Sequence, residues 1–176
     1  MAPPVGVSTA GVDQLPPAGG DGVAALAWYA SDGNRIVTRT PSGTWSAITV
    51  LSGSTSAGIG TAVDGKGNVV AGFAKINLTG TQTYVAMDPA GGTWRPAALL
   101  SALDDQGSVR VAGDPAGTTV VTWTDSAGGV EAVTIPPSGA LSSGVVAGTA
   151  PTFRLLVIPG KSVLWTAAGI SQQNVN

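Results

Sequence analysis

Side chains that can carry out chemistry are few and scattered in this sequence of 176 residues. It has no His and no Cys, so the usual general base, the commonest transition-metal ligand and every thiolate site are missing. Acid–base chemistry would fall to Asp, Glu, Lys and Tyr. Asp104-Asp105-Gln106 is the one local concentration of carboxylates in the sequence, and it supplies only part of the about six oxygen ligands that Ca²⁺ needs. We therefore predict no metal site, no cofactor and no enzymatic activity.

Two sets of residues are candidates for ligand binding. Arg110 and Arg154 each stand four residues before a turn, in segments that we expect to be the inner strands of two successive repeats. If these strands line a central channel, the two cations converge on an anion; a salt bridge to Asp13 or a solvated channel is the alternative. The second set consists of polar residues in the loops that follow the second strand of each repeat. Its members are Asp32, Asn34, Asn77, Gln82 and Asp125.

A recurring motif must position these residues. The stretch Val63 to Phe73, VDGKGNVVAGF, predicts strand, tight turn and strand, because its middle is rich in Asp, Gly and Asn and its end is apolar. Variants of it return three more times, each closed by a large aromatic residue. The aromatics follow one another at 45, 50 and 42 residues, which is the period of propeller blades. We expect them to fill the core between neighbouring sheets: Trp28, Phe73, Trp123 and Trp165.

Further strands complete each repeat. A polar turn, a third strand, a Pro-small-Gly turn and a fourth strand follow the aromatic residue, and we expect the fourth strands to open on Trp45, Trp94 and Leu141. The first repeat would begin with a short strand within 12–15. No stretch has the periodicity of a helix. We predict an all-β fold: a β-propeller of four blades with four antiparallel strands each, forming a single domain over 1–176. The blades would span about 11–52, 58–101, 108–148 and 152–176, the last completed by residues 4–10, which close the ring. The alternative is part of a larger propeller completed by other chains or by missing sequence.

The composition indicates which partners and which location the protein can have. Charged residues are 10% of the chain, against about 25% in an average domain, and the net charge is −2 without any cluster of Lys or Arg. These features argue against binding to nucleic acid. The sequence has neither a signal peptide at its start nor an apolar run long enough for membrane insertion. The uncharged, hydroxyl-rich composition is typical of exported or assembled proteins, or of a genome biased toward Ala, Gly and Val; we expect a virion, extracellular or cell-surface location.

The repeats resemble known propeller families. GTAVDGKGNVVAGF is similar to the NHL-type repeat, and the turns before Trp45 and Trp94 resemble degenerate Asp-boxes of sialidase-like propellers, with Thr40 and Pro89 at the place of the Asp. Over nearly its full length the chain also resembles β-propeller repeat proteins of high-GC actinobacteria and their phages. These resemblances imply a fold and leave the activity open.

The prediction for function follows from the missing catalytic residues and the uncharged surface. We predict a non-catalytic structural or interaction β-propeller, an accessory or host-facing component of a virion or cell envelope. Its partners would be other protein subunits, and a homo-oligomer is one form of such an assembly. The alternative is a lectin-type module that binds cell-surface glycans, and a propeller enzyme is the least favoured hypothesis.

Overall fold

The fold consists of strands and turns. The computed structural model describes the backbone of residues 22–30, 32–53, 56–101, 108–141, 145–149, 153–158, 161–166 and 169–174, and the side chains of 22–30, 32–53, 58–101 and 108–141. Within these ranges no helix occurs, and hence none that could span a membrane. The prediction of an all-β fold is confirmed. The strands are β1 (Ala24–Ala30), β2 (Gly33–Arg39), β3 (Thr49–Ser52), β4 (Ser56–Val63), β5 (Val69–Asn77), β6 (Gly80–Asp88), β7 (Ala98–Leu99), β8 (Arg110–Gly113), β9 (Thr119–Thr124), β10 (Gly129–Ile135), β11 (Val145–Thr149), β12 (Phe153–Ile158), β13 (Lys161–Thr166) and β14 (Gly169–Asn174).

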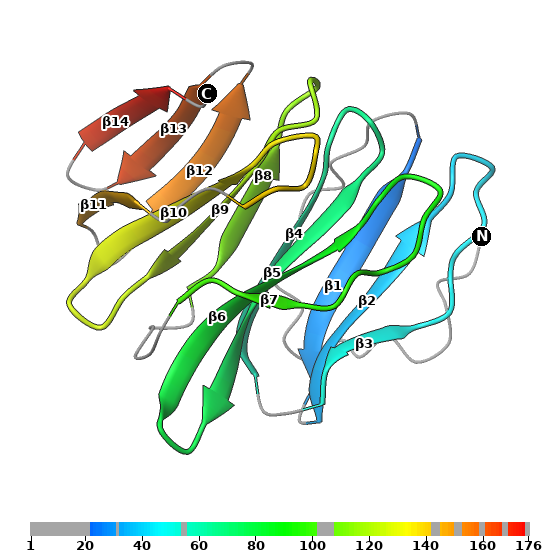
Figure 1. Ribbon diagram of the computed structural model, residues 1–176, viewed down its shortest axis with the longest axis horizontal. Helices are drawn as coiled ribbons and strands as arrows, with labels where there is room; N and C mark the ends of the chain where they lie inside the picture. The colour runs from blue at the N-terminus through cyan, green and yellow to red at the C-terminus, as the bar shows by residue number, and fades with distance from the viewer. Residues whose placement is uncertain are drawn as a thin grey trace.

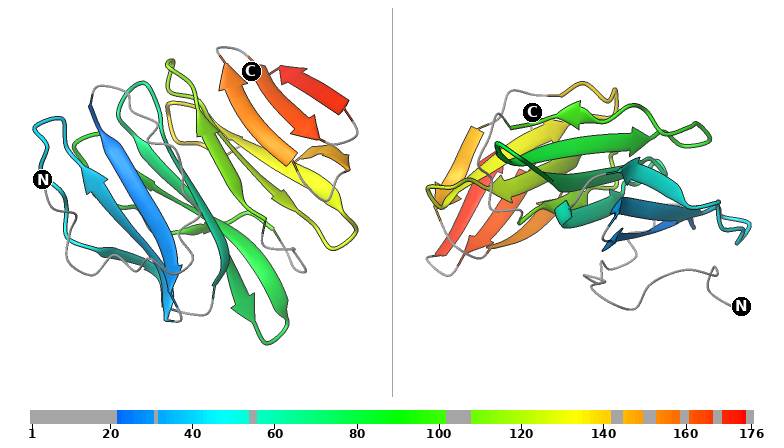
Figure 2. Two further views of the ribbon diagram at one scale, coloured as in Figure 1. Left: turned by 180° about the vertical axis from the view of Figure 1, so that it is seen from behind. Right: turned by 90° about the horizontal axis from the view of Figure 1, so that it is seen from below.

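Four antiparallel sheets follow one another along the chain. Their strand orders are β1-β2-β3, β4-β5-β6-β7, β8-β9-β10-β11 and β12-β13-β14, so every strand pairs with its neighbour in sequence. In Figures 1 and 2 the sheets succeed one another across the molecule, with β4 beside β1, β8 beside β4 and β12 beside β8. We refer to them as the first to fourth sheets.

Apolar side chains fill the spaces between the sheets. Phe73 lies in the core between the first and second sheets together with Ile36, and Trp123 lies in the core between the second and third. Trp28, Phe73 and Trp123 are 1%, 0% and 0% exposed. The Phe73 ring also stacks on Tyr84, with 5.9 Å between ring centroids. Trp165 pairs with Arg154 in the register of β12 and β13, and both side chains lie outside the described residues.

The second and third sheets also meet through their backbones. The N–H of Gly65, in the β4–β5 turn, donates a hydrogen bond of 2.9 Å to the carbonyl oxygen of Asp114, where the β8–β9 turn begins. A Cβ on Gly65 would stand 2.1 Å from the carbonyl oxygen of Pro115. Only glycine therefore permits this approach of the two turns.

The fourth strands are shorter than the sequence predicts. Trp45 and Trp94 were expected to open these strands, but β3 begins at Thr49 and β7 at Ala98. Pro96 has no N–H to donate to a partner strand, so it cannot take part in a ladder that would extend β7 toward Trp94. Before β3, the Ser46 hydroxyl accepts the bond from the Thr38 N–H, at 3.0 Å, in place of a strand partner. The strands expected within 12–15 and 4–10 lie outside the described residues.

Candidate functional site

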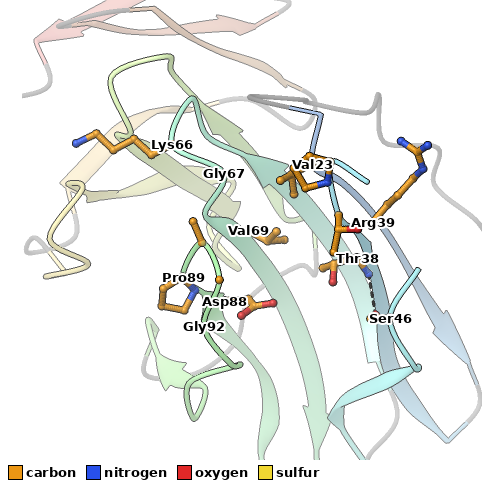
Figure 3. A pocket seen from close by; sticks show the side chains of 14 residues that line it. Val23, Thr38, Arg39, Ser46, Lys66, Gly67, Val69, Asp88, Pro89 and Gly92 are labelled. Carbon is orange, nitrogen blue, oxygen red and sulfur yellow. Dashed lines mark hydrogen bonds between the residues drawn. The ribbon is translucent and has the colours of Figure 1, made fainter. Parts of the chain in front are cut away.

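A cavity of about 520 Å³ lies between the first and second sheets. Its walls are the β2–β3, β4–β5 and β6–β7 turns, with Val23 and Val69 between them (Figure 3). Small-molecule sites in proteins commonly have volumes of roughly 300–1,000 Å³ and mostly apolar walls with a few polar groups. This cavity fits that description, so it is the candidate binding site among the described residues.

The β4–β5 turn is fixed by Asp64. Its Oδ1 atom accepts hydrogen bonds from the Lys66 N–H at 2.9 Å and the Asn68 N–H at 3.0 Å, and Gly67 supplies the positive φ of 80° that the turn requires. Asn68 then joins two turns. Its Nδ2 donates to Asp64 Oδ2 at 2.7 Å, and its Oδ1 accepts the Ala90 N–H of the β6–β7 turn at 3.0 Å. Two of the three walls are therefore held to each other before any ligand arrives.

The β2–β3 turn is also held by side-chain oxygens. The Thr40 hydroxyl accepts the Thr44 N–H at 3.2 Å and lies 2.8 Å from the Ser42 hydroxyl. These bonds add to the backbone bonds from the Thr40 N–H to the Thr44 carbonyl, at 2.9 Å, and from the Ser46 N–H to the Thr38 carbonyl, at 2.8 Å. They place the hydroxyls of Thr38 and Ser46 on the cavity side of the turn.

Asp88 is the one carboxylate among the described residues that line the cavity. It ends β6 opposite Val69 and continues the row of Tyr84 and Ala86, which faces the first sheet. Figure 3 shows its carboxylate directed toward Thr38 across the cavity. Its Oδ1 atom is buried and has no hydrogen-bond partner among the described residues. Burial raises the pKa of the Asp88 carboxyl above its ordinary value.

The repeat itself does not require this carboxylate. The residue before the Pro-small-Gly turn is Thr40 in the first sheet, Asp88 in the second and Pro136 in the third. Since all three residue types are compatible with the same turn, Asp88 is free to serve a purpose other than folding. An unpaired acceptor in a mostly apolar cavity is suited to receive hydrogen bonds from a ligand.

Two cations stand at the mouth of the cavity. Arg39 and Lys66 belong to its lining, and Figure 3 shows their side chains extending outward on opposite sides of the cavity. The Arg39 guanidinium lies over Gly43, where a Cβ would be 2.9 Å from its Nη2. Neither side chain has an ion pair within the described part of the chain.

Most residues predicted to bind a ligand lie elsewhere. They lie at the ends of the strands opposite the cavity. Asp32 and Asp125 belong to the β1–β2 and β9–β10 turns, Asn77 ends β5, and Gln82 lies near the start of β6. Asp32 forms an ion pair with Arg35. Their other contacts are local: Asn77 Nδ2 donates to Gln82 Oε1 at 2.7 Å, and Asp125 Oδ1 accepts the Gly129 N–H at 2.7 Å.

Asn34 has a structural position that its sequence context did not suggest. It is 0% exposed rather than in an exposed loop, because a bulge at Asn34 and Arg35 turns its side chain into the protein. Its Nδ2 donates to the Ser52 hydroxyl at 3.2 Å and to the carbonyl of Ala74 at 3.4 Å. The expectation of a solvent-facing ligand contact at Asn34 is corrected, since its amide links the first sheet to the second.

The proposed arginine pair is only half described. Arg110 opens β8 and its Nη1 donates to the carbonyl of Val109 at 2.9 Å. Arg154 lies on the neighbouring β12, but its side chain, like Asp13 and residues 104–106, lies outside the described residues. Convergence of the two guanidinium groups stays a prediction.

Sequence analysis did not single out Asp88, Arg39 or Lys66. A usable signal was present, because Asp88 is the only acidic residue at its position in the repeat. The broken Asp-box drew notice to Pro89, one residue later. Convergence of three separate turns on one cavity depends on the packing of two sheets, which the repeat pattern does not specify.

Comparisons with known proteins give little further information. No family model matches the sequence, and no curated protein matches it. Among solved structures, the catalytic domain of the Coprinopsis cinerea GH62 alpha-L-arabinofuranosidase is similar in part, with a TM-score of 0.43 and 11% identity. The match covers 86% of this chain and 60% of that chain. The chain thus spans less than two thirds of the length of that neighbour.

This comparison contradicts the prediction of a non-catalytic structural or interaction protein, because the similar structure is a catalytic domain. We withdraw that prediction and the exclusion of enzymatic activity. The exclusion had a physical weakness: it relied on the missing His, whereas glycoside hydrolysis uses carboxylates, of which the sequence has 10 as Asp and Glu. At this level of similarity, the neighbour assigns no activity to the chain.

Proposed function

We propose that the chain binds a saccharide unit in the cavity between the first and second sheets. The observation that carries the proposal is the Asp88 carboxylate, which belongs to the lining of a cavity of about 520 Å³ and has no hydrogen-bond partner among the described residues. Burying such an acceptor without a hydrogen bond costs free energy, so a ligand that donates to it is favoured.

The lining supports a ligand rich in hydroxyl groups. A carboxylate accepts bonds from hydroxyls, and the Thr38 hydroxyl can donate or accept. The Ser46 hydroxyl already donates to the Ala47 carbonyl at 2.8 Å and can accept a further bond. Val23 and Val69 offer apolar surface for the carbon face of a sugar ring. The bond from the Ala90 N–H to Asn68 Oδ1 supports binding as well, because a wall that is already fixed loses less entropy when the ligand arrives.

Calorimetric titration with methyl glycosides of common hexoses and pentoses tests this proposal. The Asp88→Asn variant should bind the best of these ligands roughly tenfold or more weakly, as expected for a charge-assisted hydrogen bond. Asp32→Asn is the matched control, since it removes a carboxylate outside the cavity and should leave the affinity unchanged. No binding by the wild-type chain, or equal binding by Asp88→Asn, would refute the proposal.

For the architecture we propose that the four sheets are blades of a propeller, each with four strands. The succession of β1, β4, β8 and β12 across the molecule supports this proposal. The first and fourth sheets have three described strands each, and segments 12–15 and 4–10 would complete them. Deletion of residues 1–10 should lower the melting temperature if segment 4–10 closes the ring, and an unchanged melting temperature would contradict closure.

Location outside the cell or in a virion, assembly with other subunits and kinship with actinobacterial or phage repeats stay predictions. Neighbouring genes and the native mass would test them. Capsid or tail genes beside this one would favour a virion protein, and a mass above that of one chain would favour assembly.

A further inference from the structure

The charges around the cavity indicate more about the ligand. We infer that the saccharide carries a carboxylate, as a uronic acid does, and that this group lies at the mouth of the cavity between Arg39 and Lys66. The inference rests on the proposed function and adds the chemical class of the sugar to it.

The lining is electropositive in a protein that is acidic overall. Arg39 and Lys66 against Asp88 give the described lining a net charge of +1, whereas the chain has a net charge of −2. A positive site on a negative chain attracts an anionic ligand selectively and disfavours a cationic one.

The surroundings of these two cations differ from those of Arg35 and Lys75. Arg35 forms an ion pair with a neighbouring aspartate, and the Lys75 ammonium lies 4.5 Å from the centre of a tyrosine ring. Arg39 and Lys66 have no ion pair in the part of the chain that the structure describes. Both are long side chains that stand on opposite sides of the cavity mouth (Figure 3). The Lys66 stem lies over Gly117, where a Cβ would be 2.9 Å from its Cδ.

Asp88 fixes the direction of binding. It lies inside the cavity on the β6 wall, while the cations lie at the rim. A ligand carboxylate next to Asp88 would be repelled, whereas sugar hydroxyls there would donate to it. The acid group therefore points outward, toward Arg39 and Lys66, and the hydroxyls opposite to it point inward.

Matched sugar pairs test the inference. A methyl glucuronide differs from the methyl glucoside only by a carboxylate in place of the hydroxymethyl group, and the galacturonide and galactoside form a second pair. In calorimetric titrations with the full chain, the uronide of at least one pair should bind about tenfold more tightly than its neutral partner. This ratio should fall toward one in the Arg39→Gln/Lys66→Gln double variant and at high salt concentration. Lys75→Gln, a cation outside the cavity, should leave the ratio unchanged.

The outcomes separate this inference from the proposed function. Equal affinity for acid and neutral sugars in the wild type, with binding weakened by Asp88→Asn, would overturn the acidic ligand and keep the saccharide site. A preference for uronides that survives the double variant would also overturn the assignment to Arg39 and Lys66. Absence of binding by all four sugars would overturn both proposals.

Discussion

Asn68→Ala should destabilise the protein and weaken ligand binding at the same time. The Asn68 side chain makes a hydrogen bond of 2.7 Å to the Asp64 carboxylate and one of 3.0 Å from the Ala90 N–H. Bonds to charged groups contribute about 1.5–3 kcal/mol and neutral bonds about 0.5–1.5 kcal/mol. Because Asn68 is half-buried and Ala90 is exposed, the lower ends of these ranges apply. We expect the free energy of unfolding to fall by about 2 kcal/mol.

Urea unfolding followed by tryptophan fluorescence measures this change, and titration with the best saccharide measures the effect on the cavity. Thr118 is the matched control, because it stands at the same place in the β8–β9 turn. Its N–H bonds to Asp114 Oδ1 at 2.8 Å, but its hydroxyl makes no hydrogen bond among the described residues. Thr118→Ala should therefore change stability by a few tenths of a kcal/mol and leave affinity intact. If Asn68→Ala is no more destabilising than Thr118→Ala, the Asn68 side-chain bonds between the β4–β5 and β6–β7 turns do not stabilise the walls of the cavity.

Two further predictions concern the sheet contact and the buried carboxyl. Gly65→Ala would bring a Cβ to 2.1 Å from the carbonyl oxygen of Pro115 and should cost about 3 kcal/mol, or roughly 6–12 °C in melting temperature. Gly53→Ala is the control: none of the described residues lies within 4 Å of its Cβ, and it should leave the melting temperature unchanged. Equal effects of the two substitutions would contradict the close contact at Gly65. Burial raises the pKa of Asp88 above 3.8, so the folded chain holds this proton more tightly than the unfolded one and stability falls as pH rises from 3.8 through the folded pKa. Asp88→Asn should therefore melt at a higher temperature than the wild type at pH 7, and this gain should vanish below pH 3.8; a gain that is independent of pH would refute the titration of Asp88.

The sequence predicted the strands well because their signals are local. Alternation of turn residues with β-branched runs placed the hairpin around Asp64 and the aromatic residue at Phe73, and the structure has β4, β5 and their turn at those positions. The length of β7 was not predicted. Pro96 lacks an N–H, and whether this loss shortens the strand depends on which backbone groups would have bonded to β6, which the sequence does not show.

The candidate site was harder to predict, because it belongs to no single repeat. Polar residues in loops such as Asp32 drew attention, but the cavity forms where turns from two sheets pack together. In the sequence pattern Asp88 is simply the end of a strand. Only its neighbours across the sheet interface leave its carboxylate with a buried oxygen that lacks a hydrogen-bond partner among the described residues. Asn34 shows the opposite case: a polar residue beside a turn is drawn inside by a bulge, which the sequence pattern does not encode.

The backbone contact between the β4–β5 and β8–β9 turns has a mechanical consequence. Gly65 donates its N–H to Asp114, but the residue at the same place in the next turn is Pro115, which has no N–H to give. Pro115 therefore cannot donate the equivalent backbone bond toward the fourth sheet. Under a pulling force, the second and third sheets should resist as one block, while the β12–β14 sheet peels away first and at lower load.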